Sequence, residues 1–83
     1  MVNELIQVAN DLDCKWLNTD EYFMIKFKNF KSKFKIIAKQ KAHWILVLKI
    51  KDEKCEGRMR FYNLEKLKSY ICCQFILECF QNA

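Results

Sequence analysis

The sequence predicts an α+β domain in which a helix, a four-stranded antiparallel sheet and a second helix follow one another. Both helices are expected on one face of the sheet. First, apolar and basic residues alternate through much of residues 22–61, as in strands with one buried and one solvent-facing side. Second, apolar residues recur at helical spacing near both ends of the chain. Third, 83 residues with one Gly and no Pro leave no flexible linker, so we expect a single domain over residues 1–83.

The first helix is expected from Asn3 to Cys14. Its apolar stripe consists of Leu5, Val8, Ala9 and Leu12. Asn3 is a residue type that caps helices, and a carboxylate at Glu4 is favourable near the positive end of the helix dipole. Residues 15–21 are expected to lead through Trp16 into a polar turn.

The first two strands are expected at Tyr22–Lys28 and Lys33–Gln40, joined by a turn at Asn29–Ser32. Each alternates between an apolar and a basic side. The apolar positions are Phe23, Ile25, Phe27, Phe34, Ile36 and Ala38. These rows are expected to lie under the helices, which leaves the lysine-bearing side to solvent.

The third strand, His43–Lys51, contains an apolar run at Ile45–Leu48, which is typical of a central strand covered on both faces. A turn is expected at Asp52–Glu56, with Gly57 as the residue that tolerates unusual dihedral angles. The fourth strand, Arg58–Tyr62, is expected to place its arginines on one side and Met59 and Phe61 on the other.

The second helix is expected from Leu64 to Phe80, with Asn63 as its N-cap. Its last three turns are apolar nearly all round, and a terminal helix of so small a domain cannot be buried on every side. Either the first helix shields this surface or a partner binds it. The candidate docking residues are Phe75, Ile76 and Phe80.

The sequence does not predict an enzyme, and it predicts no catalytic, cofactor-binding or metal-binding residue. His43 is the only histidine and has no nucleophile at a recognised spacing, while one Gly excludes a glycine-rich phosphate loop. The five cysteines are odd in number and include no Cys-x-x-Cys pair. We therefore expect reduced thiols and an intracellular, reducing compartment, the nucleus or the cytoplasm. The longest apolar run, Tyr70–Phe80, is too short to span a membrane.

The charge of the chain concentrates in its strands. The net charge is +5, and residues 25–60 hold twelve Lys and Arg against three Asp and Glu. The expected basic face consists of Lys26, Lys28, Lys33, Lys35, Lys39, Lys49, Lys51, Arg58 and Arg60. It is either a solvated surface that keeps strands from pairing with other chains or a binding surface for an anionic partner. Nucleic acid is disfavoured, because the aromatic residues needed for base stacking fall on the buried side.

Short motifs along nearly the whole chain resemble the kinase-associated regulatory domain at the C-terminus of many Ser/Thr kinases. The opening, Leu12-Asp13-Cys14-Lys15-Trp16 followed by residues 22–28, is similar to that domain in the α subunit of AMP-activated kinase. The remainder resembles the DNA-damage checkpoint effector kinase in Lys33-Phe34-Lys35-Ile36, Leu46-Val47-Leu48, Glu56-Gly57, Arg58 to Phe61 and Leu64 to Phe80.

The resemblance implies a non-catalytic domain that binds and restrains a kinase catalytic domain in cis, within cell-cycle checkpoint signalling. Some relatives bind anionic phospholipid, and in AMP-activated kinase the domain docks another subunit. Arg58 and Arg60, with Lys33, Lys35 and Lys39, would form the contact face. Two alternatives stay open: a membrane-surface module that binds anionic phospholipids, and a stand-alone adaptor whose last helix docks a partner.

Overall fold

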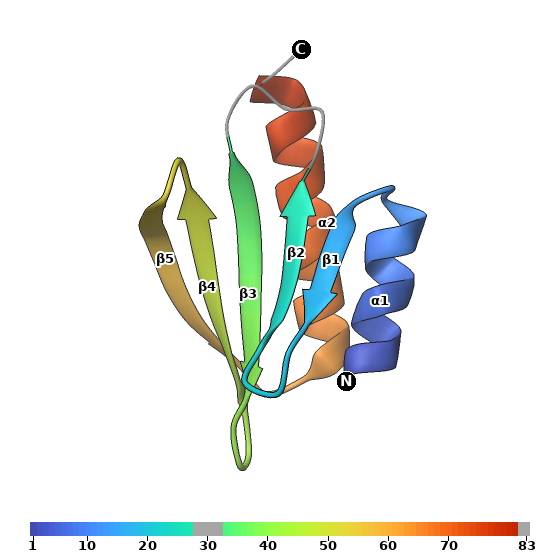
Figure 1. Ribbon diagram of the computed structural model, residues 1–83, viewed down its shortest axis with the longest axis vertical. Helices are drawn as coiled ribbons and strands as arrows, with labels where there is room; N and C mark the ends of the chain where they lie inside the picture. Colours follow the sequence, from blue (N-terminus) through green and yellow to red (C-terminus); the bar gives the residue numbers. More distant parts are fainter. Residues whose placement is uncertain (28–32, 82–83) are drawn as a thin grey trace.

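The chain folds as a five-stranded antiparallel sheet with one helix before it and one after it (Figure 1). The computed structural model describes residues 1–27 and 33–81. The elements are α1 (Val2–Asp11), β1 (Lys15–Asn18), β2 (Phe23–Phe27), β3 (Phe34–Gln40), β4 (Ile45–Lys51), β5 (Lys54–Phe61) and α2 (Leu64–Gln81). The α+β class is confirmed, and the sheet has one strand more than the sequence predicts.

The strands form a meander in which each pairs with its neighbour in the sequence, in the order β1-β2-β3-β4-β5. The register places Phe23 opposite Ala38, Ile25 opposite Ile36 and Phe27 opposite Phe34. Side chains opposite each other in register lie on the same face, so the apolar rows of β2 and β3 form one continuous surface. The expected turn at Asn29–Ser32, together with Lys28, lies outside the described residues.

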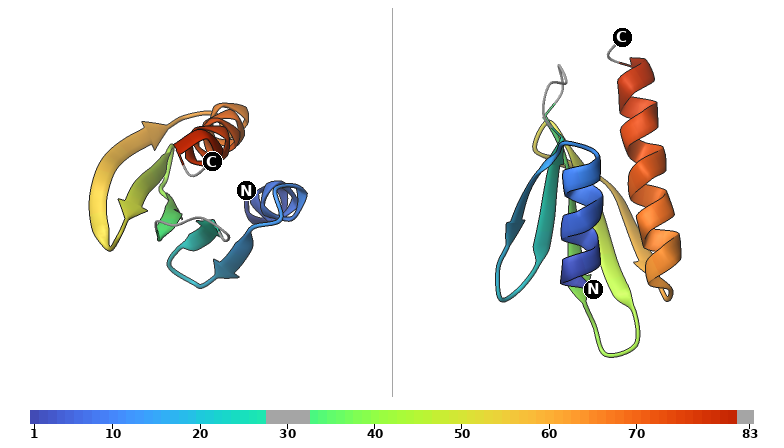
Figure 2. Two further views of the ribbon diagram at one scale, coloured as in Figure 1. Left: turned by 90° about the horizontal axis from the view of Figure 1, so that it is seen from above. Right: turned by 90° about the vertical axis from the view of Figure 1, so that its right-hand side faces the viewer.

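Both helices lie on the concave side of the curved sheet, which we call the inner face (Figure 2). The core is continuous between them and the strands. It joins Leu5, Val8 and Ala9 of α1 and Leu67 and Ile71 of α2 to Phe23, Ile25, Phe27, Phe34, Ile36, Ala38, Ile45 and Val47 of the sheet. The expected arrangement, two helices on one face, is therefore observed.

The two helix starts differ from each other. In α1, the prediction of an Asn3 cap is wrong: the helix begins at Val2 with Met1 as its N-cap residue and no side-chain cap hydrogen bond. In α2 the predicted cap is confirmed, because the Asn63 Oδ1 accepts hydrogen bonds from the backbone N–H groups of Glu65 (2.8 Å) and Lys66 (3.3 Å).

The strand that the sequence did not predict is β1, in the segment expected to be a lead-out and turn. It pairs antiparallel with β2, with Trp16 opposite Ile25 and therefore on the inner face. The Trp16 ring stacks on Phe23 with their centroids 6.0 Å apart, yet the side chain is 42 % exposed. All four residues of β1 are exposed, so this edge strand lacks the alternation of burial that identifies a strand in sequence.

The β4–β5 hairpin turns more tightly than the sequence predicts. Asp52 and Glu53 have φ values of 51° and 69°, so the turn occupies two residues and β5 begins at Lys54 rather than Arg58. Gly57 does not have a positive φ, and its expected role in the turn is wrong. It pairs with Lys49 beside a register shift at Lys49 and Ile50, where Glu56 is the extra residue on β5.

Candidate binding surface

The face of the sheet opposite the helices, which we call the outer face, carries an apolar row along β4. Trp44, just before the strand, and Leu46, Leu48 and Ile50 on it all alternate with residues of the inner face. Leu46 is only 8 % exposed, and the other three are partly buried. We call these four residues the β4 strip. Within residues 1–27 and 33–81, both helices pack on the other face, so no described helix covers it (Figure 2).

The β4 strip corrects one prediction. The run Ile45–Leu48 indicates a strand covered on both faces, but the described helices cover β4 on its inner face alone. Ile45 and Val47 pack in the core beneath the helices, while Leu46 and Leu48 point to the outer face. The run is apolar on both sides even though the described helices cover only one.

Basic side chains border the β4 strip on both neighbouring strands. On β3, Lys39 lies opposite Leu46 and Lys35 opposite Ile50; on β5, Arg60 lies opposite Leu46 and Arg58 opposite Leu48. We call these four residues the basic borders. Neighbouring strands are about 4.8 Å apart, so each border lies immediately beside the apolar row. The outer face is thus amphipathic rather than uniformly cationic.

One member of the basic borders is held in place by the strip itself. The Arg60 guanidinium carbon lies 4.4 Å from the centre of the Trp44 ring. A cation over an indole face is attracted by the ring's quadrupole. The arrangement restricts Arg60 before any partner arrives, and it gives Trp44 a position from which a binding event can be detected by fluorescence.

A second cationic feature lies toward the other end of β3. Lys26, Lys33 and Lys35 line a shallow hollow of about 200 Å³ together with Phe34 and Glu53. Lys33 is fixed to the β4–β5 hairpin, since its N–H donates to the Asp52 Oδ1 at 3.1 Å and the Asp52 N–H donates to the Lys33 carbonyl at 2.8 Å. Three lysines and one glutamate line the hollow, so cationic side chains outnumber the carboxylate and an anionic group could bind there.

Two residues expected on the basic face lie on the other face. Lys49 and Lys51 are in register with Ile36 and Phe34, and so point toward α2. The Lys49 Nζ lies 5.6 Å from the centre of the Phe34 ring, and the Lys51 Nζ lies 3.6 Å from the Glu78 Oε1, in a side chain only 3 % exposed. Strand alternation sets this placement, because Ile45, Val47, Lys49 and Lys51 share one parity. Lys28 lies outside the described residues.

The candidate docking residues on α2 separate into two groups. Phe75 packs against the core, with its ring centroid 5.7 Å from that of Phe27, and is only partly exposed. Ile76 and Phe80 are 53 % and 77 % exposed, and Leu77, which is not among the candidate docking residues, is 50 % exposed. With Cys73, these residues form an exposed apolar stripe at helical spacing. Helix α1 does not shield this stripe from solvent.

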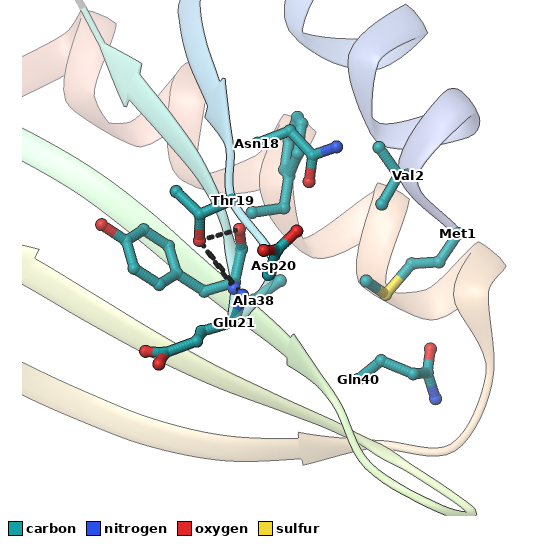
Figure 3. A pocket seen from close by; sticks show the side chains of 10 residues that line it. Met1, Val2, Asn18, Thr19, Asp20, Glu21, Ala38 and Gln40 are labelled. Carbon is teal, nitrogen blue, oxygen red and sulfur yellow. Dashed lines mark hydrogen bonds between the residues drawn. The ribbon is translucent and has the colours of Figure 1, made fainter.

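A small hollow of about 140 Å³ lies between the start of α1 and the β1–β2 turn (Figure 3). Met1 and Val2 line one side, and Thr19, Asp20 and Glu21 line the other. The Thr19 Oγ1 is engaged in the turn, where it accepts from the Tyr22 N–H at 3.1 Å and from the Glu21 N–H at 3.3 Å. Its hydrogen bonds serve the turn, so this hollow offers no prepared nucleophile.

The described residues bring together no group of three or more His, Cys, Asp or Glu that could hold a metal ion. His43 is exposed at the β3–β4 connection. Cys14 is buried, whereas Cys55, Cys73 and Cys79 are exposed thiols. Neither described helix combines the length and hydropathy that a bilayer crossing requires.

Comparison with protein-family models, with curated proteins and with solved structures found no match for this chain.

Proposed function

We propose that this chain is a non-catalytic regulatory domain of a Ser/Thr protein kinase that binds and restrains the kinase catalytic domain in cis through the outer face. The β4 strip with its basic borders carries the proposal. An apolar row that no described helix covers, with arginine and lysine on either side, has the make-up of a protein-binding surface. A face that served solubility alone would not need four large apolar side chains. The motif resemblance agrees with this proposal.

Reversal of the borders tests the proposal in the full-length kinase. The double variant Arg58→Glu, Arg60→Glu is expected to raise basal kinase activity, because like charges would oppose docking. Circular dichroism of the isolated chain should show the fold retained, since both side chains are exposed. A matched control, Lys54→Glu with Lys66→Glu, makes the same change in net charge away from the borders and should leave activity unchanged. Unaltered activity in the first variant would count against the proposal.

A second candidate function is a membrane-surface module that binds anionic phospholipids. The hollow lined by Lys26, Lys33 and Lys35 favours it, because three lysines converge there. Sedimentation with phosphatidylserine vesicles should then show binding that falls steeply between low and physiological salt, since exposed charges are screened within about 10 Å at 0.1 M salt. Binding to neutral phosphatidylcholine vesicles of equal strength would exclude this function.

A third candidate, a stand-alone adaptor, depends on the exposed stripe of α2.

For all three candidates we propose a reducing intracellular compartment, the nucleus or the cytoplasm. The exposed thiols Cys55, Cys73 and Cys79 support this proposal, because an oxidising compartment would favour their modification.

A further inference from the structure

We propose that the β4 strip binds an amphipathic α-helix whose apolar stripe is bordered on both sides by aspartate or glutamate. This inference deepens the proposed function, on which it rests for the choice of face, and specifies the partner's chemistry. Three features of the outer face support it: the length of the strip, the spacing of the basic borders and the pairing of the strands.

The length of the strip suits a short helix. From Trp44 to Ile50 the chain advances six residues, or about 20 Å at the rise of a strand. A helix rises about 1.5 Å per residue, so roughly 13 residues would cover the strip. Apolar side chains at positions i, i+4, i+7 and i+11 of such a helix would lie along it.

The width of the surface suits a helix as well. The strands that carry the basic borders lie about 4.8 Å to either side of β4, so the two borders are roughly 10 Å apart, close to the diameter of a helix. Positions beside the apolar stripe of a docked helix would lie above Lys35 and Lys39 on one side and above Arg58 and Arg60 on the other. Carboxylates at those positions would face cations at both borders, which is charge complementarity.

The sheet's own hydrogen bonds argue against an added strand. The backbone of β4 is paired on both sides, with β3 and with β5. An extended peptide could pair only with an edge strand, β1 or β5, and could not lie over Leu46 and Leu48 in that way. A helix satisfies its own backbone hydrogen bonds and needs only side-chain contacts.

The strip also favours a protein over other anionic partners. Single-stranded nucleic acid requires exposed aromatic faces, and the outer face's Trp44 has one ring face beneath Arg60. A lipid headgroup layer would meet the long basic side chains, but it would not bury the apolar row of the β4 strip that lies between them. A helix with an apolar stripe uses the borders and the row between them together.

Three synthetic 14-residue helical peptides provide the test. The first has leucines at i, i+4, i+7 and i+11 with glutamates beside them; the second replaces the glutamates by lysines; the third keeps the glutamates and replaces the leucines by serines. Binding is measured by fluorescence anisotropy of labelled peptide, and the site is mapped by NMR of isotope-labelled chain. We expect the first peptide to bind, and the other two to bind at least about tenfold more weakly.

Variants of the chain locate the contact. Leu48→Asp should weaken binding of the first peptide about tenfold or more, and Leu48→Thr, which keeps a strand-forming residue, provides the same test if Leu48→Asp does not fold. Leu77→Asp is a matched control on the exposed stripe of α2 and should not change binding. Equal binding of the glutamate and lysine peptides, no binding of the first peptide, or NMR shifts confined to α2 would each overturn the proposal.

Three outcomes separate this proposal from its alternatives. If a kinase catalytic domain binds the outer face but the first peptide neither binds nor competes, the helix proposal fails and the proposed function stands. If the peptide binds while Arg58→Glu, Arg60→Glu leaves the full-length kinase unchanged, the proposed function fails and the helix proposal stands. Binding to phosphatidylserine vesicles without binding to the peptide would assign the face to a membrane and overturn the helix proposal.

Discussion

Two successive isoleucines of β3 test whether the domain covers its sheet on one face only. Ile36 is 1 % exposed and lies opposite Ile25 in the core, whereas Ile37 is on the outer face between Met24 and Leu48. Ile36→Ala and Ile37→Ala remove the same three carbons from adjacent positions of one strand. We expect the first to destabilise the domain much more than the second.

The expected sizes follow from burial. Three carbons are worth about 2.4 kcal/mol when fully buried, and a cavity left beneath two helices brings the cost of Ile36→Ala to roughly 3–4 kcal/mol. Ile37 is partly exposed on an open face, so about half of the transfer energy is lost without a closed cavity, or about 1 kcal/mol. The loss of strand propensity is similar for both and cancels in the difference, which should be about 2–3 kcal/mol.

Urea unfolding of the two variants measures this difference. A domain of this size has roughly 4–12 kcal/mol of stability, so both variants are expected to retain a measurable transition. If Ile36→Ala unfolds the chain outright, Ile36→Val, with an expected cost of about 0.5–1.5 kcal/mol, can be compared with Ile37→Val. Equal costs at the two positions would refute a one-sided sheet, because they would mean that Ile37 is covered as fully as Ile36.

Three further predictions concern α2. Asn63→Ala should cost about 1 kcal/mol in urea unfolding, because two backbone N–H groups lose their acceptor, while Asn63→Asp should keep most of that stability. Burial raises the pKa of the Tyr70 phenol above its ordinary value of 10.0, so absorbance titration should show a phenolate step above pH 10 that is absent in Tyr70→Phe. Because the folded state holds this proton more tightly than the unfolded state, the free energy of unfolding should be unaffected by Tyr70 below pH 10 and should decline as the pH rises through the folded-state pKa. Phe80→Ser, at a side chain 77 % exposed, should change the free energy of unfolding by less than about 0.5 kcal/mol, and a larger loss would contradict that exposure. Analytical ultracentrifugation of the wild-type chain and of Phe80→Ser would report any self-association that Phe80 supports.

The elements with clear periodicity could be predicted from the sequence. In β2 and β3 every inward side chain except Gln40 at the end of β3 is apolar, so alternation located both strands and assigned their faces correctly. The Asn63 cap could be predicted because its mechanism is local, a side-chain oxygen that accepts from the first turn. The cap expected at Asn3 failed because the helix starts earlier, at Val2.

The remaining elements depend on tertiary pairing. β1 is a short edge strand that gains its hydrogen bonds from β2, and its four exposed residues show no alternation of burial. The β4–β5 turn uses positive φ at Asp52 and Glu53, residue types that give weaker turn signals than the nearby glycine.

The candidate surface could be predicted only in part. Alternation correctly placed Lys26, Lys35, Lys39, Arg58 and Arg60 on the outer face. It could also have excluded Lys49 and Lys51, which share parity with the buried Val47. The apolar run around Val47 concealed that parity, because both faces of β4 are apolar there. For the same reason, the sequence predicted that the residues of the β4 strip would be covered, and it did not predict a binding surface there.

The most direct test of the proposed function is an NMR cross-saturation experiment. The labelled 83-residue chain is mixed with an unlabelled kinase catalytic domain of the checkpoint type, and saturation of the kinase is transferred to the residues in contact. The proposal predicts transfer to the methyl groups of Leu48 and Ile50, which are partly exposed, and none to Ile71 in the core. Transfer confined to Ile76 and Leu77 of α2 would contradict it. So would the absence of any transfer at concentrations at which the added chain inhibits the kinase catalytic domain.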